Sequence, residues 1–338
     1  MAHETSQTAR DSVANDSTIE HSELRAHTRD GITLAITRVR DTSRTSRAAV
    51  MLQHGLASNG GAFLVPQQSF AEHLARLGYD CYVTELRAVG KSEVPKDEPG
   101  FDAFIELDLP ALIEAVLACS GQPKLIFVGH SMGGILGLSY ALEHPDAPFT
   151  SVMAVCSSLD YRAGKNAYQD LNRIKPLAKL LPFIPFRALA QANATVAGVG
   201  PVFPPEGMNF HRSNVEREVL RHMLSTGFER IPIRLLEDLS TTFDDQGFSR
   251  AGGTIRYHEL APSYAFRTLL IAGSKDKQCP PETVAATFAL LTGCEDKHAI
   301  TIGTTHGHAD DYGHFDPFVG KRAPQEAWPL MTAFLARS

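Results

Sequence analysis

The sequence predicts an α/β protein with a mostly parallel, doubly wound sheet, an antiparallel opening hairpin and an inserted, mainly helical cap. From residue 48 onward, short apolar runs alternate with longer amphipathic segments, which is typical of buried parallel strands and their crossover helices. Between Asp160 and Pro262, about 100 residues contain no such run, which is too long for a plain loop. We therefore expect a core over 23–160 and 263–338, with a cap over 161–262.

The first two strands are expected at 24–27 and 32–38, on either side of Asp30-Gly31, because Asp-Gly is a strong hairpin turn signal. Residues 1–22 are rich in Ser, Thr, Asp and Glu and are expected to form a disordered polar tail. The apolar runs predict buried strands at 48–52, 81–86, 125–129, 152–156, 269–273 and 298–302. The segments between them predict helices at 66–77, 104–119, 132–144, 281–291 and 324–336.

Composition excludes several classes of function. The formal charge of the 338-residue chain is 32 − 38 = −6, which repels nucleic acid, so we expect no nucleic-acid partner. No run of 18 uncharged apolar residues occurs and the N-terminus lacks a secretory pattern, so we expect neither a stable membrane anchor nor export. Five cysteines without C-x-x-C spacing suggest neither a disulfide framework nor a zinc site. We therefore expect a cytoplasmic protein.

A candidate nucleophile lies in Gly129-His130-Ser131-Met132-Gly133, which follows an apolar strand and opens a small-residue helix. This is the context of a nucleophile elbow. The tight turn forces Ser131 into a strained conformation, and it leaves no room for a Cβ at Gly129 or Gly133. Ser131 is therefore expected to project its hydroxyl at the carboxyl edge of the sheet.

A serine nucleophile requires a base and a group that orients the base, and in this fold class they follow the serine in the order acid, then histidine. Asp276 follows the strand at 269–273 and is the expected acid, with Asp160 as the substitute. His314 is the expected base, with His306 and His308 as alternatives. These histidines, with Asp310 and Asp311, could alternatively be interpreted as metal ligands. We nevertheless expect no metal and no cofactor.

The oxyanion hole needs two backbone N–H groups, one from the residue after the nucleophile and one from the loop after the third strand. Met132 supplies the first. In Gln53-His54-Gly55-Leu56, Gly55 lets the chain turn back over the nucleophile, and Leu56 supplies the second. His54 has two interpretations: a direct catalytic role, or, at least equally well supported, a core histidine bonded to the backbone.

The order of these motifs resembles the α/β-hydrolase superfamily over 23–160 and 263–338. Gln53-His54-Gly55-Leu56 and His314-Phe315-Asp316 are more specifically similar to its acid-lipase-like branch. The resemblance implies an α/β-hydrolase fold and a serine hydrolase that acts on an acyl compound, with Ser131, Asp276 and His314 as catalytic triad. One departure is Glu85-Leu86-Arg87-Ala88-Val89-Gly90, where many members have Asp-x-Arg-Gly-x-Gly.

The expected activity is cleavage of a small-molecule ester, lactone or thioester through a covalent acyl-enzyme. An acyltransferase or cyclase would use the same residues, and a non-catalytic binding protein could keep the fold. Apolar residues crowd into 177–186, where prolines prevent a long helix, and predict a short lid over an apolar acyl group. Phe183 and Phe186 are its expected substrate contacts, although these side chains could instead complete the core of the cap. The apolar residues are Leu177, Leu180, Leu181, Phe183, Ile184 and Phe186.

Overall fold

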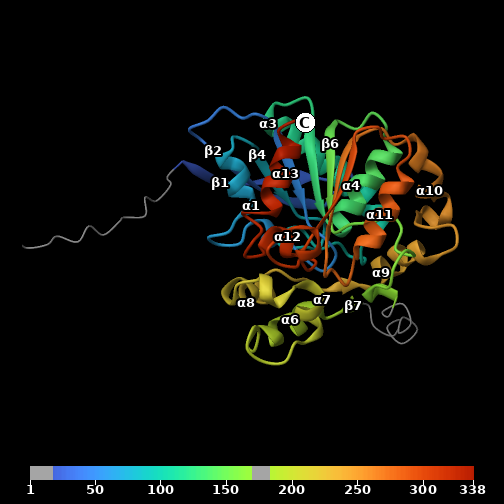
Figure 1. Cartoon of the computed structure of the whole chain (residues 1–338). Helices are drawn as coiled ribbons and strands as arrows, with labels where there is room; N and C mark the ends of the chain where they lie inside the picture. The colour runs from blue at the N-terminus through green and yellow to red at the C-terminus, as the bar shows by residue number, and fades with distance from the viewer. Residues whose placement is uncertain (1–17, 170–182) are drawn as a thin grey trace, which may run out of the picture.

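The computed structural model describes residues 18–169 and 183–338 and has an eight-stranded sheet between two layers of helices (Figure 1). The strand order is β1-β2-β4-β3-β5-β6-β11-β12, in which β1 and β2 are antiparallel to their neighbours and the other pairs are parallel. This confirms the predicted fold class. The strands are β1 (Ile19–His27), β2 (Thr33–Asp41), β3 (Ala49–Gln53), β4 (Asp80–Thr84), β5 (Leu125–His130), β6 (Phe149–Val155), β11 (Arg267–Gly273) and β12 (Lys297–Ile302).

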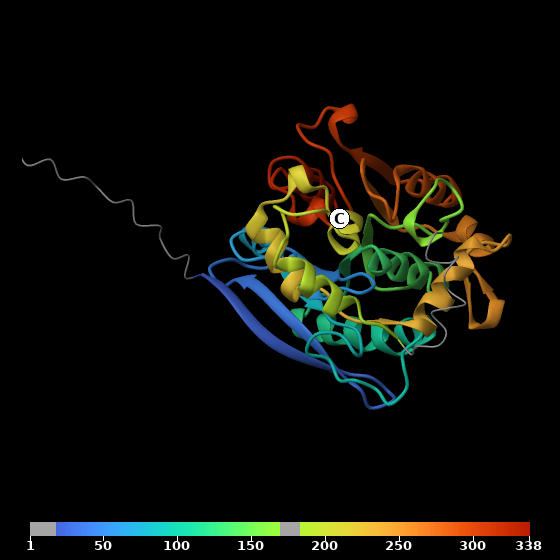
Figure 2. The same cartoon turned by 90° about the horizontal axis from the view of Figure 1, so that it is seen from below.

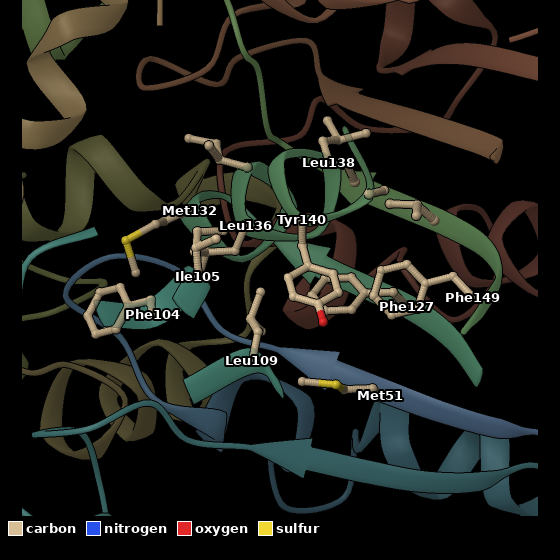
Figure 3. Packing of buried hydrophobic residues seen from close by; sticks show 14 of the residues in the cluster. Met51, Phe104, Ile105, Leu109, Phe127, Met132, Leu136, Leu138, Tyr140 and Phe149 are labelled. Carbon is tan, nitrogen blue, oxygen red and sulfur yellow. The ribbon is translucent and has the colours of Figure 1, made fainter. Parts of the chain in front are cut away.

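The central strands are buried on both faces, as their continuous apolar runs predict. In β3, Met51 faces one core while Val50 and Leu52 face the other. The core around Met51 includes residues of α3, α4 and α11, and Figure 3 shows part of it, with Phe127 and Phe149 against Tyr140. The opposite core includes residues of α1, α12 and α13. These helices are α1 (Phe70–Arg76), α3 (Leu109–Ser120), α4 (Met132–Glu143), α11 (Pro281–Leu290), α12 (Asp316–Val319) and α13 (Ala327–Leu335).

The described part of the 161–262 segment is mainly helical and divides into two regions. Helices α6, α7 and α8 lie below the ends of the strands in Figure 1 and cross these ends in Figure 2. An isolated bridge between Ser58, after β3, and Phe228 joins this region to the sheet edge. Later residues pack against the sheet's own helices, because Tyr257 donates to Glu143 at the end of α4 (2.7 Å). The elements are β7 (Phe183–Ile184), α6 (Phe186–Ala194), α7 (Pro204–Asn209), α8 (Arg217–Thr226), β8 (Ile231–Pro232), α9 (Ile233–Ser240), β9 (Ser249–Arg250), β10 (Ile255–Arg256) and α10 (Tyr257–Leu260).

Several predicted boundaries were wrong, including the start of the helix predicted at 66–77, which begins at Phe70. Residues 19–22 are not part of a polar tail, since β1 begins at Ile19 and pairs with β2 along its whole length. An edge strand of this kind is stabilised by cross-strand pairs such as Glu20 with Arg40 rather than by large apolar side chains. The last helix begins at Ala327, not at 324. The predicted helix at 104–119 is interrupted, because α2 (Phe101–Ala103) and a π-helix (Phe104–Asp108) precede α3.

All five cysteines are free thiols. Among residues 18–169 and 183–338, the structure contains no helix long and apolar enough to cross a bilayer. The cytoplasmic location stays a prediction.

Candidate active site

Ser131 occupies a sharp turn between β5 and α4. Its φ of 54° and ψ of −123° are strained for a residue with a side chain. The turn is held because the N–H of Ser131 donates to Val155 O (2.9 Å) and its carbonyl accepts from Ser157 Oγ (2.7 Å). A Cβ on Gly129 would lie 2.3 Å from backbone atoms of Gly133, so the glycine spacing reflects a close approach of two chain segments.

Asp276 and His314 meet at the same edge of the sheet, and both are buried. His314 Nδ1 lies 2.7 Å from Asp276 Oδ2. The other carboxylate oxygen accepts the backbone N–H groups of Gln278 (2.8 Å) and Cys279 (2.9 Å). Because the carboxylate accepts at Nδ1, the imidazole carries its proton there, and Nε2 is left with a lone pair that can accept a proton.

His130 links the serine turn to the histidine loop. Its Nε2 donates to the carbonyl of His314 (2.9 Å), and the two rings are 4.7 Å apart between centroids. Burial, together with the neighbouring His314, holds the pKa of His130 well below its usual range, so this imidazole is neutral. The contact positions the backbone of His314 directly beside the turn that carries Ser131.

The alternative acid and bases occupy other places. Asp160 forms a bidentate pair with Arg162 (2.9 and 2.8 Å), whereas His314 is paired with Asp276. His308 Nδ1 lies near the backbone of Gly303 (3.3 Å), and His306 is exposed. In the described ranges, the histidines and aspartates of 306–311 do not gather into a metal-ligating group. The structure therefore pairs Asp276 with His314 and leaves the alternatives apart.

The segment after β3 passes against Ser131. A Cβ on Gly55 would lie 2.8 Å from Ser131 Cβ, so only glycine fits at this approach. The imidazole of His54 fixes this segment: its Nδ1 lies 2.9 Å from Gly55 O and its Nε2 accepts the N–H of Leu86 (3.2 Å). Burial lowers the pKa of His54 to about 4. His54 is thus a buried histidine bonded to the backbone.

Leu56 and Met132, the two expected oxyanion-hole residues, line the same pocket. Most of its other lining residues are apolar, including Phe104, which lies beside Met132 in Figure 3. Arg230 also lines the pocket, but its charge is paired with Glu98 (3.0 Å). The pocket is therefore lined mainly by apolar side chains. The remaining lining residues are His54, Gly55, Ala57, Leu86, Arg87, Ala88, Val89, Pro99, Glu229, Pro232 and Leu235.

The predicted lid lies only partly in the described chain. Leu177, Leu180 and Leu181 lie outside the described residues. The ring of Phe186 packs edge-on against Phe228, with centroids 5.4 Å apart. The ring of Phe183 lies under Arg230, which lines the pocket, at 5.1 Å. Substrate contact by the two phenylalanines stays a prediction.

Asp316 connects the loop that carries His314 to the 161–262 segment. Its Oδ2 accepts the N–H groups of Gly313 (2.8 Å) and His211 (3.0 Å), and the N–H of Phe315 donates to Asn209 O (2.9 Å). Burial raises the pKa of Asp316 well above its usual range. The third residue of His314-Phe315-Asp316 therefore has a structural role, since it accepts a backbone N–H just before His314 and one from the 161–262 segment.

Two residues near Ser131, Asp276 and His314 were not predicted from the sequence. Tyr168 donates to Gln278 Oε1 (2.8 Å), and burial raises the pKa of its phenol, an effect that the nearby Ser131 side chain partly offsets. Cys156 follows β6 with a φ of 53°, and its thiol interacts with the carboxylate of Asp276. The predicted strand at 152–156 places Cys156 at this edge of the sheet, but nothing near it in the sequence indicates a carboxylate partner.

Comparison with known protein families matches residues 48–321 to the alpha/beta hydrolase fold. The chain belongs to this family. Among solved structures, this α/β-hydrolase chain is similar to the enol-lactonase from Burkholderia xenovorans LB400 (TM-score 0.62, 17% identity, 93% of this chain and 100% of that one). It is also similar to a thermophilic esterase from Thermogutta terrifontis (TM-score 0.60, 16% identity, 94% and 98%). At these identities, the likeness shows the fold alone.

Two curated relatives of this α/β-hydrolase chain are lipases by name. The chain is 31% identical over 132 residues to a tear acid lipase-like protein of Mesocricetus auratus, which covers 34% of this chain and 33% of that protein. It is 32% identical over 131 residues to lipase member M of Homo sapiens, which covers 34% and 31%. The matched stretch thus spans about a third of each relative.

Proposed function

We propose that the protein is a serine hydrolase that cleaves a carboxylic ester, lactone or thioester through a covalent acyl-enzyme. The observation that carries the proposal is the combination of a strained Ser131 after β5 with the buried His314–Asp276 pair (2.7 Å) at the same edge of the sheet. Its lipase-named relatives support the same class of reaction. Asp276, which already accepts two backbone N–H groups, favours the tautomer of His314 that can act as a base.

In the proposed acylation step, Ser131 Oγ forms a bond to the carbonyl carbon while His314 Nε2 takes the hydroxyl proton. The carbonyl oxygen becomes an anion that the N–H groups of Leu56 and Met132 stabilise. The bond from carbon to the leaving oxygen or sulfur then breaks, and the imidazolium returns the proton to the leaving group. Water attacks the acyl-enzyme by the same route and releases the acid and free Ser131.

The acyl group is proposed to occupy the pocket beside Leu56 and Met132, because most of the residues that line this pocket are apolar. Phe183 and Phe186 are proposed to extend this apolar surface from the cap. The substrate is therefore proposed to be a small molecule with an apolar acyl part.

The decisive experiment is intact mass spectrometry after reaction with a fluorophosphonate probe, followed by hydrolysis of a series of esters. Ser131→Ala should lose the adduct and lower turnover by ~10⁴ to 10⁶. Ser139→Ala is the matched control, because Ser139 is a buried serine of the adjoining helix and should keep both. Labelling elsewhere with near-native turnover of Ser131→Ala would refute the proposal. Labelling at Ser131 with acyl transfer only to added acceptors would favour an acyltransferase.

A further inference from the structure

A cysteine lies beside the acid–base pair at the end of the strand next to the nucleophile. Cys156 is fully buried and has a φ of 53°, and its N–H donates to Ile271 O (2.7 Å) on the neighbouring strand. This anchored turn places the thiol within 4.8 Å of a carboxylate oxygen of Asp276. Burial and this carboxylate both raise the pKa of Cys156, so the thiol is protonated as long as no cation displaces its proton.

The thiol completes a set of metal-ligating atoms. Cys156 Sγ, a carboxylate oxygen of Asp276 and a ring nitrogen of His314 all lie within 4.8 Å of one another, and all three residues are buried. Sulfur, nitrogen and oxygen are the donors that zinc takes in proteins, at about 2.0 to 2.3 Å. At these bond lengths, two donor atoms around one tetrahedral ion are about 3.3 to 3.8 Å apart. His314 Nδ1 and Asp276 Oδ2 are now 2.7 Å apart, so metal binding requires them to separate by about 1 Å or less.

The charges of the set also suit a divalent cation. Thiolate and carboxylate together carry two negative charges, so a bound ion of charge 2+ gives a neutral complex. A neutral complex avoids the large cost of an uncompensated charge in a buried position. Softer cations are favoured, because thiolate ligands select Zn²⁺ over Mg²⁺ or Ca²⁺.

We propose that Cys156, Asp276 and His314 form an inhibitory site for a thiophilic divalent cation such as Zn²⁺. Binding releases the thiol proton to solvent and places the cation on the lone pair of His314 Nδ1. The imidazole proton therefore moves from Nδ1 to Nε2, where it blocks the nitrogen that takes the proton of Ser131. Asp276 is occupied at the same time. The site rests on the proposed function, because it inhibits by capturing two of the three triad residues.

Cys279 provides a matched control. It is buried like Cys156 and adjoins the same carboxylate, since its backbone N–H donates to Asp276 Oδ1 (2.9 Å). Its thiol pairs with Thr283 Oγ1 instead (3.3 Å) and does not belong to the ligand set. Cys279→Ser thus changes a neighbouring thiol and leaves the three donors in place.

The test titrates Zn²⁺ against ester hydrolysis by the wild type, Cys156→Ser, Cys156→Ala and Cys279→Ser, each relative to its own metal-free rate. The wild type and Cys279→Ser should be inhibited alike, and a chelator should restore their activity. In both Cys156 variants the inhibitory concentration should rise by at least about 10- to 100-fold, since the loss of even an outer-shell partner of a metal ligand costs that much affinity. Mg²⁺ should have no effect. Equal inhibition of the wild type and Cys156→Ser would overturn the proposal.

A second readout does not depend on catalysis. Co²⁺ added to the wild type, or to the inactive Ser131→Ala, should give a thiolate-to-cobalt charge-transfer band that Cys156→Ser lacks. Absence of the band in the wild type would reject the site even if the enzyme hydrolyses esters. Conversely, a chain that shows the band but hydrolyses no ester would keep the site and reject the proposed function.

Discussion

Acidification should destabilise the protein through the buried imidazole of His54. Burial lowers the pKa of His54 to about 4 from 6.5 in an exposed histidine, a difference worth about 3 kcal/mol. The unfolded state binds the additional proton between these values. The contribution of His54 to stability is therefore fully present above pH 6.5 and is lost as the pH falls toward 4. About 2 kcal/mol of it should disappear between about pH 7 and about pH 5.

The measurement is urea unfolding across this pH interval, followed by the fluorescence of Trp328, the only tryptophan. His54→Gln removes the titrating group, so its stability should fall by about 2 kcal/mol less than that of the wild type over the interval. Other groups, including the neutral His130, titrate in both proteins and cancel in this comparison. His306→Gln, at an exposed position, should behave like the wild type. An equal loss in His54→Gln and the wild type would refute the reasoning.

The remaining predictions concern catalysis. His314→Ala should abolish fluorophosphonate labelling because the base is lost, whereas His306→Ala should label nearly as fast as the wild type. Equal losses of labelling in the two variants would overturn the assignment of His314 as the base. Gly55→Ala should lower kcat by about 10² to 10³, because its Cβ would lie 2.8 Å from Ser131 Cβ and displace the segment that carries Leu56. A change of only a few fold would exclude that segment from catalysis. Each CH₂ of an acyl chain should add ~0.8 kcal/mol of binding until the pocket is full. Replacing Phe183 or Phe186 by Ala should flatten this dependence, and an unchanged profile in folded variants would leave these rings as scaffold.

The sequence was sufficient to predict the features that depend on residues close together in the chain or on the order of the strands. The turn at Ser131 was predictable because the flanking glycines and the apolar strand before them are contiguous. The meeting of Asp276 with His314 was predictable from chain order, since carboxyl ends of parallel strands share an edge. The start of β1 at Ile19 was not, because its stability comes from pairing with residues near Asp41 rather than from its own side chains.

Contacts between distant segments were the features that the sequence could not supply. No pattern near Cys156 indicates a carboxylate partner 120 positions later, and its positive φ belongs to a residue type with no preference for that conformation. Tyr168 meets Gln278 only because the cap folds back over the sheet edge. The role of His54 was left open for the same reason, since its partner Leu86 lies on a different strand connection.

Backbone strain is concentrated where the chemistry is proposed. In the described chain six non-glycine residues have positive φ, and four of them, Ala57, Ala88, Ser131 and Cys156, follow β3, β4, β5 and β6. These strands are adjacent in the sheet, so the four strained residues lie along one edge. Each such residue costs of order 1–3 kcal/mol and persists only where surrounding contacts determine it. Because Cys156 shares this edge with Ser131, the same local strain that shapes the turn at Ser131 also places the thiol of Cys156 near Asp276.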